Sequence, residues 1–333
     1  MGVTLENIAR DLKVSIATVS RALSSTKRNG LSDETRRLIL EAAQRLGYQR
    51  RKTNSRSVAF IIDKSAFSLA SEFYAEVISG VEEELAKQGH FFQFIAVESN
   101  ELEYQKVNMN LGDLAGVILI GVFDDKFVRH LENINIPMIL VDYYLPTENT
   151  ETILIDNADG ILRACRYLYD IGHRRVAYIS GARNQLSADD RLYAFKRAQE
   201  MFGFDRDPVL LEPSSPKMKG GFNAMDKILR KSRRPPTAVV AHNDIIAIGA
   251  MDAIKLHGLS IPGDISVCGF DDIRHAADVV PSLSTVHVPI RTIGKIAVHR
   301  ILQAISGKRD LIRKILIPTR LVIRDSIASA KRQ

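Results

Sequence analysis

The sequence has few of the features that mark secreted, membrane-spanning or metal-stabilised proteins. It has two cysteines, Cys165 and Cys268, and without a CxxC pair they exclude a disulfide framework and a thiolate zinc site. The longest apolar run, from Ala115 to Phe123, is about half as long as a membrane-spanning helix. No apolar block follows Met1, so we expect no secretory signal. We therefore expect a protein of the reducing cytoplasm.

The sequence also lacks the motifs of common catalytic sites. It contains no GxSxG nucleophile elbow, no HExxH zinc motif and no GxxxxGK[ST] phosphate loop. No group of cysteine and histidine residues has the spacing of metal ligands. Asp271 and Asp272 are paired carboxylates only in sequence, because adjacent residues need not share a face. We therefore expect neither an enzyme nor a bound metal or cofactor.

Positive charge is concentrated at one end of a chain of 333 residues, a length that suggests roughly two domains. Residues 1–57 hold 12 Lys/Arg and 5 Asp/Glu, whereas the rest of the chain holds 34 of each sign. The whole net charge of +7 therefore lies in this first segment. A small basic segment on a neutral body predicts a polyanion-binding module attached to a domain that binds another ligand.

Residues 1–48, called the head below, have the apolar spacing of three short helices. Thr4 can cap the first helix, and Ser15 can cap a second helix that ends near Leu23. A third helix is expected to begin near Ser32 and to stop at Gly47. Two short helices joined by about three residues, with a third completing the core, predict a helix-turn-helix. Such a unit places the start of its second helix in the DNA major groove.

The predicted DNA contacts come from the second helix and from the basic residues after the head. Arg21 can make a bidentate contact to guanine, and Ile16 or Ala17 can touch a thymine methyl group. Short hydroxyl side chains suit phosphate oxygens. The predicted set is Thr4, Ser15, Ile16, Ala17, Thr18, Ser20, Arg21, Arg50, Arg51 and Lys52. The alternative interpretation is a basic three-helix bundle with no role on DNA.

From residue 58 onward, apolar strands alternate with helices, which predicts an α/β body with parallel, helix-covered sheets. We expect strands at residues 58–63, 90–97, 116–122, 138–142, 153–155, 175–180, 237–241, 266–270 and 315–323. We expect helices at residues 73–87, 102–111, 127–132, 160–171, 191–201, 221–230, 245–257 and 290–305. Ligands of such proteins bind at the carboxyl ends of the strands.

Polar residues follow the ends of several predicted strands. Carboxylates and amides can bond hydroxyl groups, and arginine offers a planar fork of donors. The candidate residues are Asp63, Asp142, Asn243 and Asp271 after strands, Arg191 at the start of a predicted helix, and the rings of Phe73, Tyr74, Tyr143 and Phe270. Polar groups that converge among aromatic rings suit a sugar, whose ring faces are apolar and whose rim is polar.

Some of these groups have purely structural interpretations as well. Arg191 and Asp271 can form an ion pair that bridges two subdomains, with or without a ligand contact. Asn243 can simply cap the helix that follows it. His242, His287 and Cys268 are expected to be packing residues rather than chemical groups.

Ordered runs in both parts of the chain resemble the lactose/galactose repressor family, and together they cover nearly the whole chain. In the head these runs are Val3-Thr4-Leu5-Glu6-Asn7-Ile8-Ala9, Val14-Ser15-Ile16-Ala17-Thr18-Val19-Ser20-Arg21-Ala22-Leu23, Ser32-Asp33-Glu34-Thr35-Arg36 and Leu46-Gly47-Tyr48. In the body they include residues 155–157, 172–179, 236–238, 243–244, 265–272 and 281–286. The resemblance implies a helix-turn-helix head on a periplasmic-binding-protein-like body of two subdomains joined by three crossovers.

The resemblance also implies domain boundaries and site residues. The helix-turn-helix domain spans residues 1–48, a short basic linker 49–57, and an effector-binding and dimerisation domain 58–333. Within this last domain, the N subdomain spans about 58–155 and 290–312, and the C subdomain about 156–289 and 313–326. Ser187 and Arg191 match an effector-binding pair of the family, and other effector-site positions match Asp63, Phe73, Asp142, Asn243 and Asp271. The dimer contact is expected along helices 73–87 and 245–257.

The linker departs from the family pattern. It is about seven residues shorter than the family's hinge and has no leucine to wedge into the minor groove. Its Arg50, Arg51 and Lys52 suit an extended arm on DNA phosphates, whereas the alternative is a solvated linker without contacts.

These patterns predict a sequence-specific transcriptional regulator, most often a repressor in this family, that binds a roughly palindromic operator as a homodimer. An effector in the cleft between the subdomains is expected to control its affinity for DNA. A sugar is the first candidate effector, and a nucleobase or another metabolite is the alternative. A cytosolic sugar-binding protein or enzyme, or a transport-type solute receptor, is a more distant alternative, because none of them explains the basic head.

Overall fold

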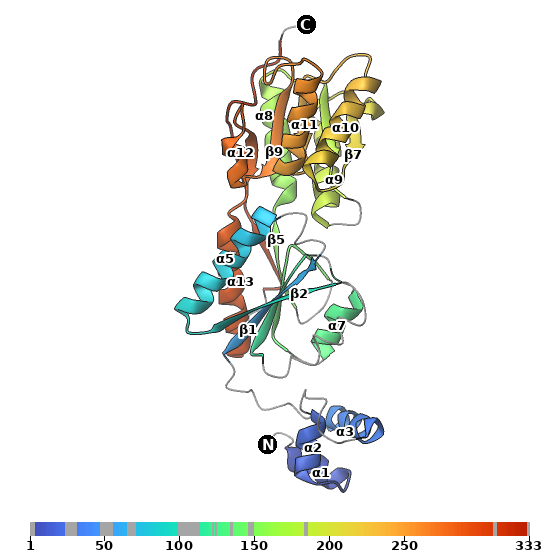
Figure 1. The fold of residues 1–333 in the computed structure, drawn as a ribbon, viewed down its shortest axis with the longest axis vertical. Coiled ribbons are helices and arrows are strands. Elements are labelled where there is room, and N and C mark those ends of the chain that lie inside the picture. Colours follow the sequence, from blue (N-terminus) through green and yellow to red (C-terminus); the bar gives the residue numbers. More distant parts are fainter. Residues whose placement is uncertain are drawn as a thin grey trace.

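A computed structural model describes residues 4–23, 32–46, 56–64, 71–98, 114–121, 123, 125–133, 136–145, 150–182, 186–308 and 312–331. Within these residues, a three-helix head precedes a body that contains two six-stranded sheets, and Figure 1 shows the three parts as separate bodies. The predicted α/β class is therefore confirmed. Among the helices described, none is long and apolar enough to cross a membrane.

The head packs three helices around a small apolar core. They are α1 (Leu5–Asp11), α2 (Ile16–Leu23) and α3 (Asp33–Arg45). The Oγ of Ser15 accepts the Thr18 N–H at 3.0 Å, which caps α2 as predicted. An ion pair between Arg45 and Asp11 joins α3 to α1. The buried core consists of Ile8, Ala9, Val19, Ala22, Ile39, Ala42 and Ala43.

The first sheet forms the N subdomain, and all of its strand pairs are parallel. Its order is β11-β5-β4-β3-β1-β2, with β1 (Ser57–Asp63), β2 (Phe91–Val97), β3 (Gly116–Ile120), β4 (Met138–Val141), β5 (Glu151–Ile155) and β11 (Lys314–Ile317). Helices α5 (Ser71–Lys87) and α13 (Ile290–Ile305) pack on one face, and α7 (Asp125–Asn133) packs on the other. The continuous apolar runs of β1, β3 and β4 are buried because helices cover both faces.

The second sheet forms the C subdomain. Its order is β12-β10-β9-β8-β6-β7, with β6 (Val176–Ser180), β7 (Leu211–Pro213), β8 (Ala238–Ala241), β9 (Ser266–Asp271), β10 (Ser284–His287) and the antiparallel β12 (Arg320–Val322). Helices α8 (Asn157–Asp170) and α9 (Leu186–Phe202) cover one face, and α10 (Met218–Lys231) and α11 (Asp244–Leu256) cover the other. A 3-10 turn (Pro208–Leu210) and the short α12 (Arg274–Asp278) complete it.

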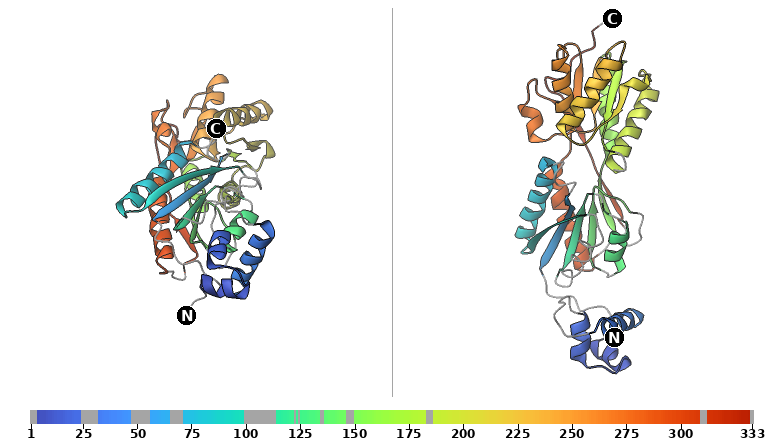
Figure 2. Two further views of the ribbon diagram at one scale, coloured as in Figure 1. Left: turned by 60° about the horizontal axis from the view of Figure 1, so that its bottom comes forward. Right: turned by 45° about the vertical axis from the view of Figure 1, so that its right-hand side comes forward.

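Three crossovers join the subdomains within the described residues, as the family resemblance implied. The chain crosses at Asp156, at residues 288–289 between β10 and α13, and at residues 318–319 between β11 and β12. The first and third crossovers touch, because the Asp156 N–H donates to the Ile317 carbonyl at 2.9 Å. The right-hand view of Figure 2 shows the chain passing between the two subdomains as a narrow waist.

Several predicted elements differ from the structure. The single strand expected at 315–323 is wrong, because β11 and β12 lie in different sheets on either side of Pro318, whose ring removes a ladder N–H. Residues 314–317 therefore belong to the N subdomain, not to the C subdomain as the resemblance suggested. The predicted strands omitted β7 and β10, and the predicted helices omitted α12. The helix expected at 102–111 lies outside the described residues.

Candidate functional site

Carboxylates from both subdomains act electrostatically on the hydroxyl group of Tyr74. Asp63 ends β1 and Asp142 follows β4 in the N subdomain, whereas Asp271 ends β9 in the C subdomain. Burial raises the pKa of the Tyr74 hydroxyl, and Asp142, Asp271 and Asp63 raise it further in that order. Such an effect requires the three carboxylates to be near Tyr74, on the first turn of α5. The structure thus brings these four predicted site residues together between the sheets.

Arg191 on α9 is the centre of the polar contacts on the C subdomain side. Its Nε donates to Asn157 Oδ1 at 2.7 Å, and its Nη1 donates to the His242 carbonyl at 2.6 Å. Its Nη2 donates to Asp271 Oδ1 at 3.2 Å. The guanidinium plane lies over the Phe270 ring, 3.7 Å from the centroid. Arg191 is only 3% exposed, so these contacts fix its position.

The alternative interpretation, in which the Arg191–Asp271 ion pair bridges the two subdomains, is wrong. The ion pair exists, but α9 and β9 both belong to the C subdomain. The subdomain bounds implied by the family resemblance already placed both residues within 156–289, and no crossover lies between them. The pair therefore organises one wall of the site.

Left-handed backbone turns direct two of the carboxylates. Asp142 has φ +52° and Asp271 has φ +109°, values that residues other than glycine rarely adopt. Aspartate tolerates this region better than most residues do. Both turns come at the carboxyl end of a parallel strand, where each redirects a side chain that would otherwise follow the strand's alternation. Strain of this kind is common in binding sites.

The same two carboxylates are held in surroundings that disfavour their charge. Burial raises the pKa of Asp142 to about 7, and Asp271 and Asp190 add to this rise while Arg191 opposes it. Burial likewise raises the pKa of Asp271 to about 6, against the hydrogen bond and charge of Arg191. Shifted titrations of this kind often accompany a functional site.

The remaining predicted effector residues have different surroundings. Asn243 caps α11, because its Oδ1 accepts the Ile246 N–H at 3.0 Å, which leaves its amide NH2 for a ligand. Ser187 is half-buried on the first turn of α9, one turn before Arg191. Phe73 packs edge-on against Tyr74, with ring centroids 5.4 Å apart.

Tyr143, also considered as a candidate ring, is committed to another contact. Its hydroxyl group donates to Asp125 Oδ1 at 2.6 Å, which ties the chain after β4 to the start of α7. This contact keeps the Tyr143 hydroxyl within the N subdomain.

Two further residues lie at this site: Asn157, which the sequence patterns missed, and His242, which was expected to be a packing residue. His242 is 6% exposed, and its buried Nδ1 has no hydrogen-bond partner among the described residues. Its ring lies against Gly181, where an added Cβ would come within 2.6 Å of it. Asn157 holds Arg191, as described above. The available sequence signal for His242 was its adjacency to Asn243. For Asn157 it was the Asp156-Asn157 motif.

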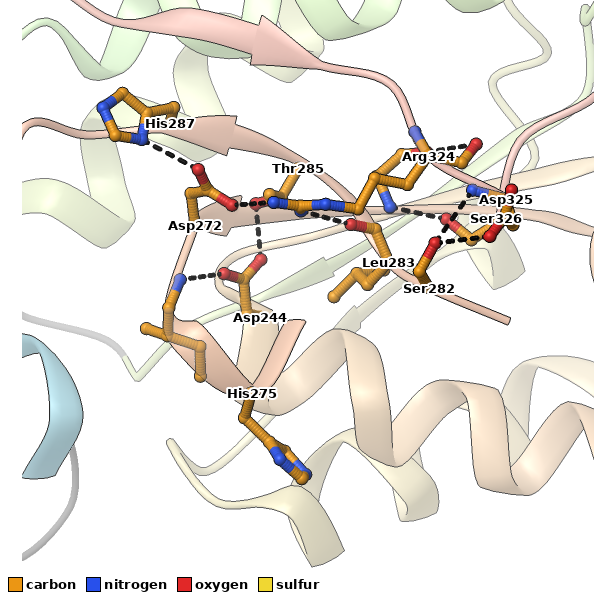
Figure 3. A network of polar contacts seen from close by, with 12 residues as sticks. Asp244, Asp272, His275, Ser282, Leu283, Thr285, His287, Arg324, Asp325 and Ser326 are labelled. Carbon is orange, nitrogen blue, oxygen red and sulfur yellow. Dashed lines mark hydrogen bonds and ion pairs between the residues drawn. The ribbon is translucent and has the colours of Figure 1, made fainter. Parts of the chain in front are cut away.

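A second polar network supports the loop after β9 (Figure 3). Asp272 accepts from His287 Nδ1 at 2.8 Å and from Arg324 Nη2 at 2.6 Å. The buried Asp244 accepts from the Thr285 hydroxyl at 2.5 Å. Together these bonds connect β9, β10, α11 and the chain after β12. They fix the backbone next to Asp271 without entering the site itself.

The predicted DNA-contacting face of the head is accessible. Ser15, Ile16 and Ala17 are exposed at the start of α2, and Ile16 exposes 46% of its surface although it is apolar. Thr4 is also exposed, and Thr18 is half-buried with its hydroxyl group 2.7 Å from Ser15 Oγ. The backbone of residues 20–21 continues α2, while Arg50, Arg51 and Lys52 lie outside the described residues.

Comparisons with known proteins agree with this division into head and body. Residues 4–51 match the family of bacterial regulatory proteins called the lacI family, and residues 165–327 match a periplasmic binding protein-like domain. The chain is 31% identical over 335 residues to the ribose operon repressor of Haemophilus influenzae, covering 98% of this chain and 99% of that protein. The chain belongs to the LacI family of bacterial regulatory proteins.

Other members and solved structures extend the similarity. The repressor CytR of Escherichia coli is 29% identical, covering 97% of this chain and 96% of that protein. A transcriptional regulator CelR–cellobiose complex has a TM-score of 0.75 and 26% identity, covering 97% of this chain and 99% of that chain. A Lac repressor dimer bound to operator and the anti-inducer ONPF has a TM-score of 0.73 and 25% identity, covering 98% of this chain and 100% of that chain. This LacI-family chain is thus a DNA-binding transcriptional regulator with an effector-binding body.

Proposed function

We propose that this LacI-family regulator represses transcription as a homodimer and that a hydroxyl-rich small molecule between its subdomains controls operator binding. The observation that supports this most directly is the group of carboxylates from both subdomains around Tyr74, facing the fixed Arg191. A ligand that bonds both walls at once favours the closed arrangement of the subdomains, and operator affinity changes with that arrangement.

The DNA part of the proposal assigns base contacts to the start of α2. Ile16 and Ala17 form an exposed apolar step that suits thymine methyl groups, and Arg21 follows one turn later for guanine. Thr4, Ser15, Thr18 and Ser20 are assigned to phosphates, together with Arg50, Arg51 and Lys52 of the linker. Two heads related by a two-fold axis require a roughly palindromic operator.

Exposed apolar residues support dimerisation through the C subdomain. Leu256, at the end of α11, is 70% exposed, and Val280, after α12, is 80% exposed. Lys255 Nζ donates to the Val280 carbonyl at 2.6 Å, so the two apolar side chains belong to one surface. A groove of about 600 Å³ lies nearby between α5, α12 and the start of α13. The family resemblance assigned the dimer contact to α11, which ends at the apolar surface, and to α5, which lines the groove.

A sugar is the effector that the site supports best. Its acceptors are carboxylate oxygens, its donors come from Asn243 and Ser187, and Phe73 and Tyr74 supply aromatic rings. Phe270, also predicted as an effector residue, is fully buried beneath Arg191 and supports that side chain instead. The relatives named for ribose and cellobiose support the same class. A nucleobase is the second candidate, because the same aromatic rings can stack on a planar base.

The test combines operator selection with a ligand screen on the full-length protein. We expect a random duplex library to yield a roughly palindromic operator, and ribose, cellobiose or another sugar to shift both the melting temperature and the bound fraction of operator. Adenosine and hypoxanthine test the second candidate. Failure to enrich any sequence would contradict the DNA assignment, and enrichment without a response to any ligand would contradict the effector assignment.

We also place this regulator in the cytoplasm, where its operator DNA lies, and assign it no catalytic turnover. Support comes from the relatives, which are named as repressors. The expected result is that a bound sugar is recovered chemically unchanged after prolonged incubation with the protein, which mass spectrometry can measure. Recovery of a converted product would contradict the assignment.

A further inference from the structure

The walls of the effector site carry an excess of negative charge. Asp63 and Asp271 are buried, at 4% and 8% exposure, and Asp142 is half-buried. Asp190, on α9 one residue before Arg191, interacts with Asp142 and adds a fourth carboxylate. Hydrogen-bond acceptors therefore outnumber donors where the two subdomains face each other.

Arg191 is the one buried arginine or lysine among the described residues. Because most of its N–H groups are bonded within the protein, it does not offset the negative charge that a ligand meets in the site. Arg191 already donates through Nε, Nη1 and Nη2 to Asn157, the His242 carbonyl and Asp271, and its plane is covered by Phe270. A guanidinium recognises a carboxylate or phosphate through two parallel N–H groups. These contacts use three of the five N–H groups of Arg191, so an acidic ligand would find at most one further N–H on each of Nη1 and Nη2.

Among the residues that the structure describes, the other basic groups near the site do not supply a second cation to its interior. Burial lowers the pKa of His242 well below its usual value, and the charge of Arg191 lowers it further, so its imidazole is neutral. Lys314 interacts with Asp190, but it is exposed on β11, where its Nζ lies 5.1 Å from the centroid of the Tyr144 ring. Its charge is therefore largely screened by water.

We propose that the effector carries no acidic group and binds through hydroxyl or amino donors, so that the site selects neutral or cationic ligands against their anionic derivatives. Each donor of such a ligand can engage a carboxylate, and a donor shared by Asp142 and Asp271 relieves the repulsion between two like charges. An anionic substituent in the same position instead adds to that repulsion. The inference rests on the proposed effector function and narrows its chemistry.

The experiment uses sets of ligands that share one skeleton and differ in charge. The sets are ribose with ribose 5-phosphate, glucose with glucosamine and glucuronate, galactose with galactosamine and galacturonate, and adenosine with AMP. Calorimetric titration of the full-length protein gives each affinity, and operator release gives the response. Within any set whose neutral member binds, we expect the acidic member to bind at least about tenfold more weakly and the amino member at least as tightly.

The variant Asp142→Asn tests whether the selectivity for neutral over acidic ligands comes from this site. Asparagine keeps the shape of the side chain and tolerates the left-handed backbone at this position, so the variant is expected to fold. We expect it to narrow the difference in affinity between the neutral and acidic members of a set. Asp170→Asn, at the exposed end of α8 where Asp170 pairs with Arg166, is the matched control and should leave the difference unchanged.

The outcomes separate this inference from the function on which it rests. An acidic member that binds as tightly as its neutral parent, or more tightly, overturns the inference while leaving the effector function intact. If Asp142→Asn and Asp170→Asn narrow the difference in affinity between neutral and acidic ligands equally, the selectivity does not come from Asp142, and its assignment to this site is overturned. If no member of any set binds, both the inference and the proposed sugar or nucleobase effector are contradicted, and only the proposed operator binding by the head is unaffected.

Discussion

The head and the effector site both depend on charged side chains, but they hold them in opposite surroundings. In the head, Arg10, Lys13 and Arg37 are exposed, and the small apolar core contains no charge. In the body, Arg191 and Asp271 are buried and bonded to each other. Exposed charges interact with a polyanion through counterion release, whereas buried charges respond to protons and to the hydrogen-bonding groups of a ligand. Salt is therefore expected to control the head, and pH to control the site.

The largest expected effect follows from removing the buried charge of the body. Arg191→Ala leaves Asp271 without its partner, and breaking a buried ion pair costs about 3–5 kcal/mol. We expect lower stability in urea unfolding, unchanged operator affinity and loss of the effector response. Arg166→Ala, which removes an exposed pair, should change none of these measurements appreciably. A full response of Arg191→Ala at an unchanged effector concentration would show that Arg191 has only a structural role.

A smaller effect is expected from the head residue assigned to base readout. Arg21→Ala should lose about 1–3 kcal/mol of discrimination between the operator and a scrambled duplex, because a bidentate contact to guanine disappears. Gel-shift titrations on the two duplexes measure this difference, and the effector affinity should stay constant. An equal loss of affinity on both duplexes would argue for a phosphate contact instead.

The pH dependence of stability tests the buried carboxylates. Because the pKa of Asp142 is about 7 in the folded protein and lower when unfolded, the folded state retains a proton between about pH 4 and pH 7. Stability therefore falls as pH rises through this window, and the cost is complete above it. We expect Asp142→Asn to raise the melting temperature clearly at about pH 8 and less at about pH 5. A larger gain at the lower pH would contradict the assigned shift.

The smallest expected effect concerns a single linker charge. Arg51→Ala should weaken binding to all duplexes similarly and reduce the slope of log affinity against log salt by about one. Effector binding should change little over the same range of salt, because its charges are buried. Titrations at several salt concentrations measure both slopes. A specific loss on the operator alone would place Arg51 at a base edge.

The elements that sequence patterns predicted best are those whose signals are local. The caps at Ser15 and Asn243, and the buried runs of β1 and β3, follow from short-range chemistry, and the structure has them. The split between β11 and β12 was also signalled by Pro318, but the apolar pattern on both sides of it favoured one strand.

The parts that could not be predicted depend on contacts between distant segments. The sequence indicated that Arg191 and Asp271 are polar residues near a ligand, and the family resemblance placed both in the C subdomain. Neither indicated that Arg191 also bonds Asn157 and the His242 carbonyl. The sequence indicated that His242 is a packing residue, but not that it packs against Gly181, because that contact depends on the packing of β8 beside β6. The roles of the site residues in binding remain predictions, and the experiments above test them.

Strand β1 begins at Ser57, where the linker from the head enters the body, and ends at Asp63 in the candidate effector site. It pairs with β2 on one side and β3 on the other, so its seven residues form a stiff rod of about 20 Å. Its neighbours prevent it from stretching or buckling. We therefore expect a displacement of Asp63 to move Ser57 as well, at the end of β1 to which the head is connected.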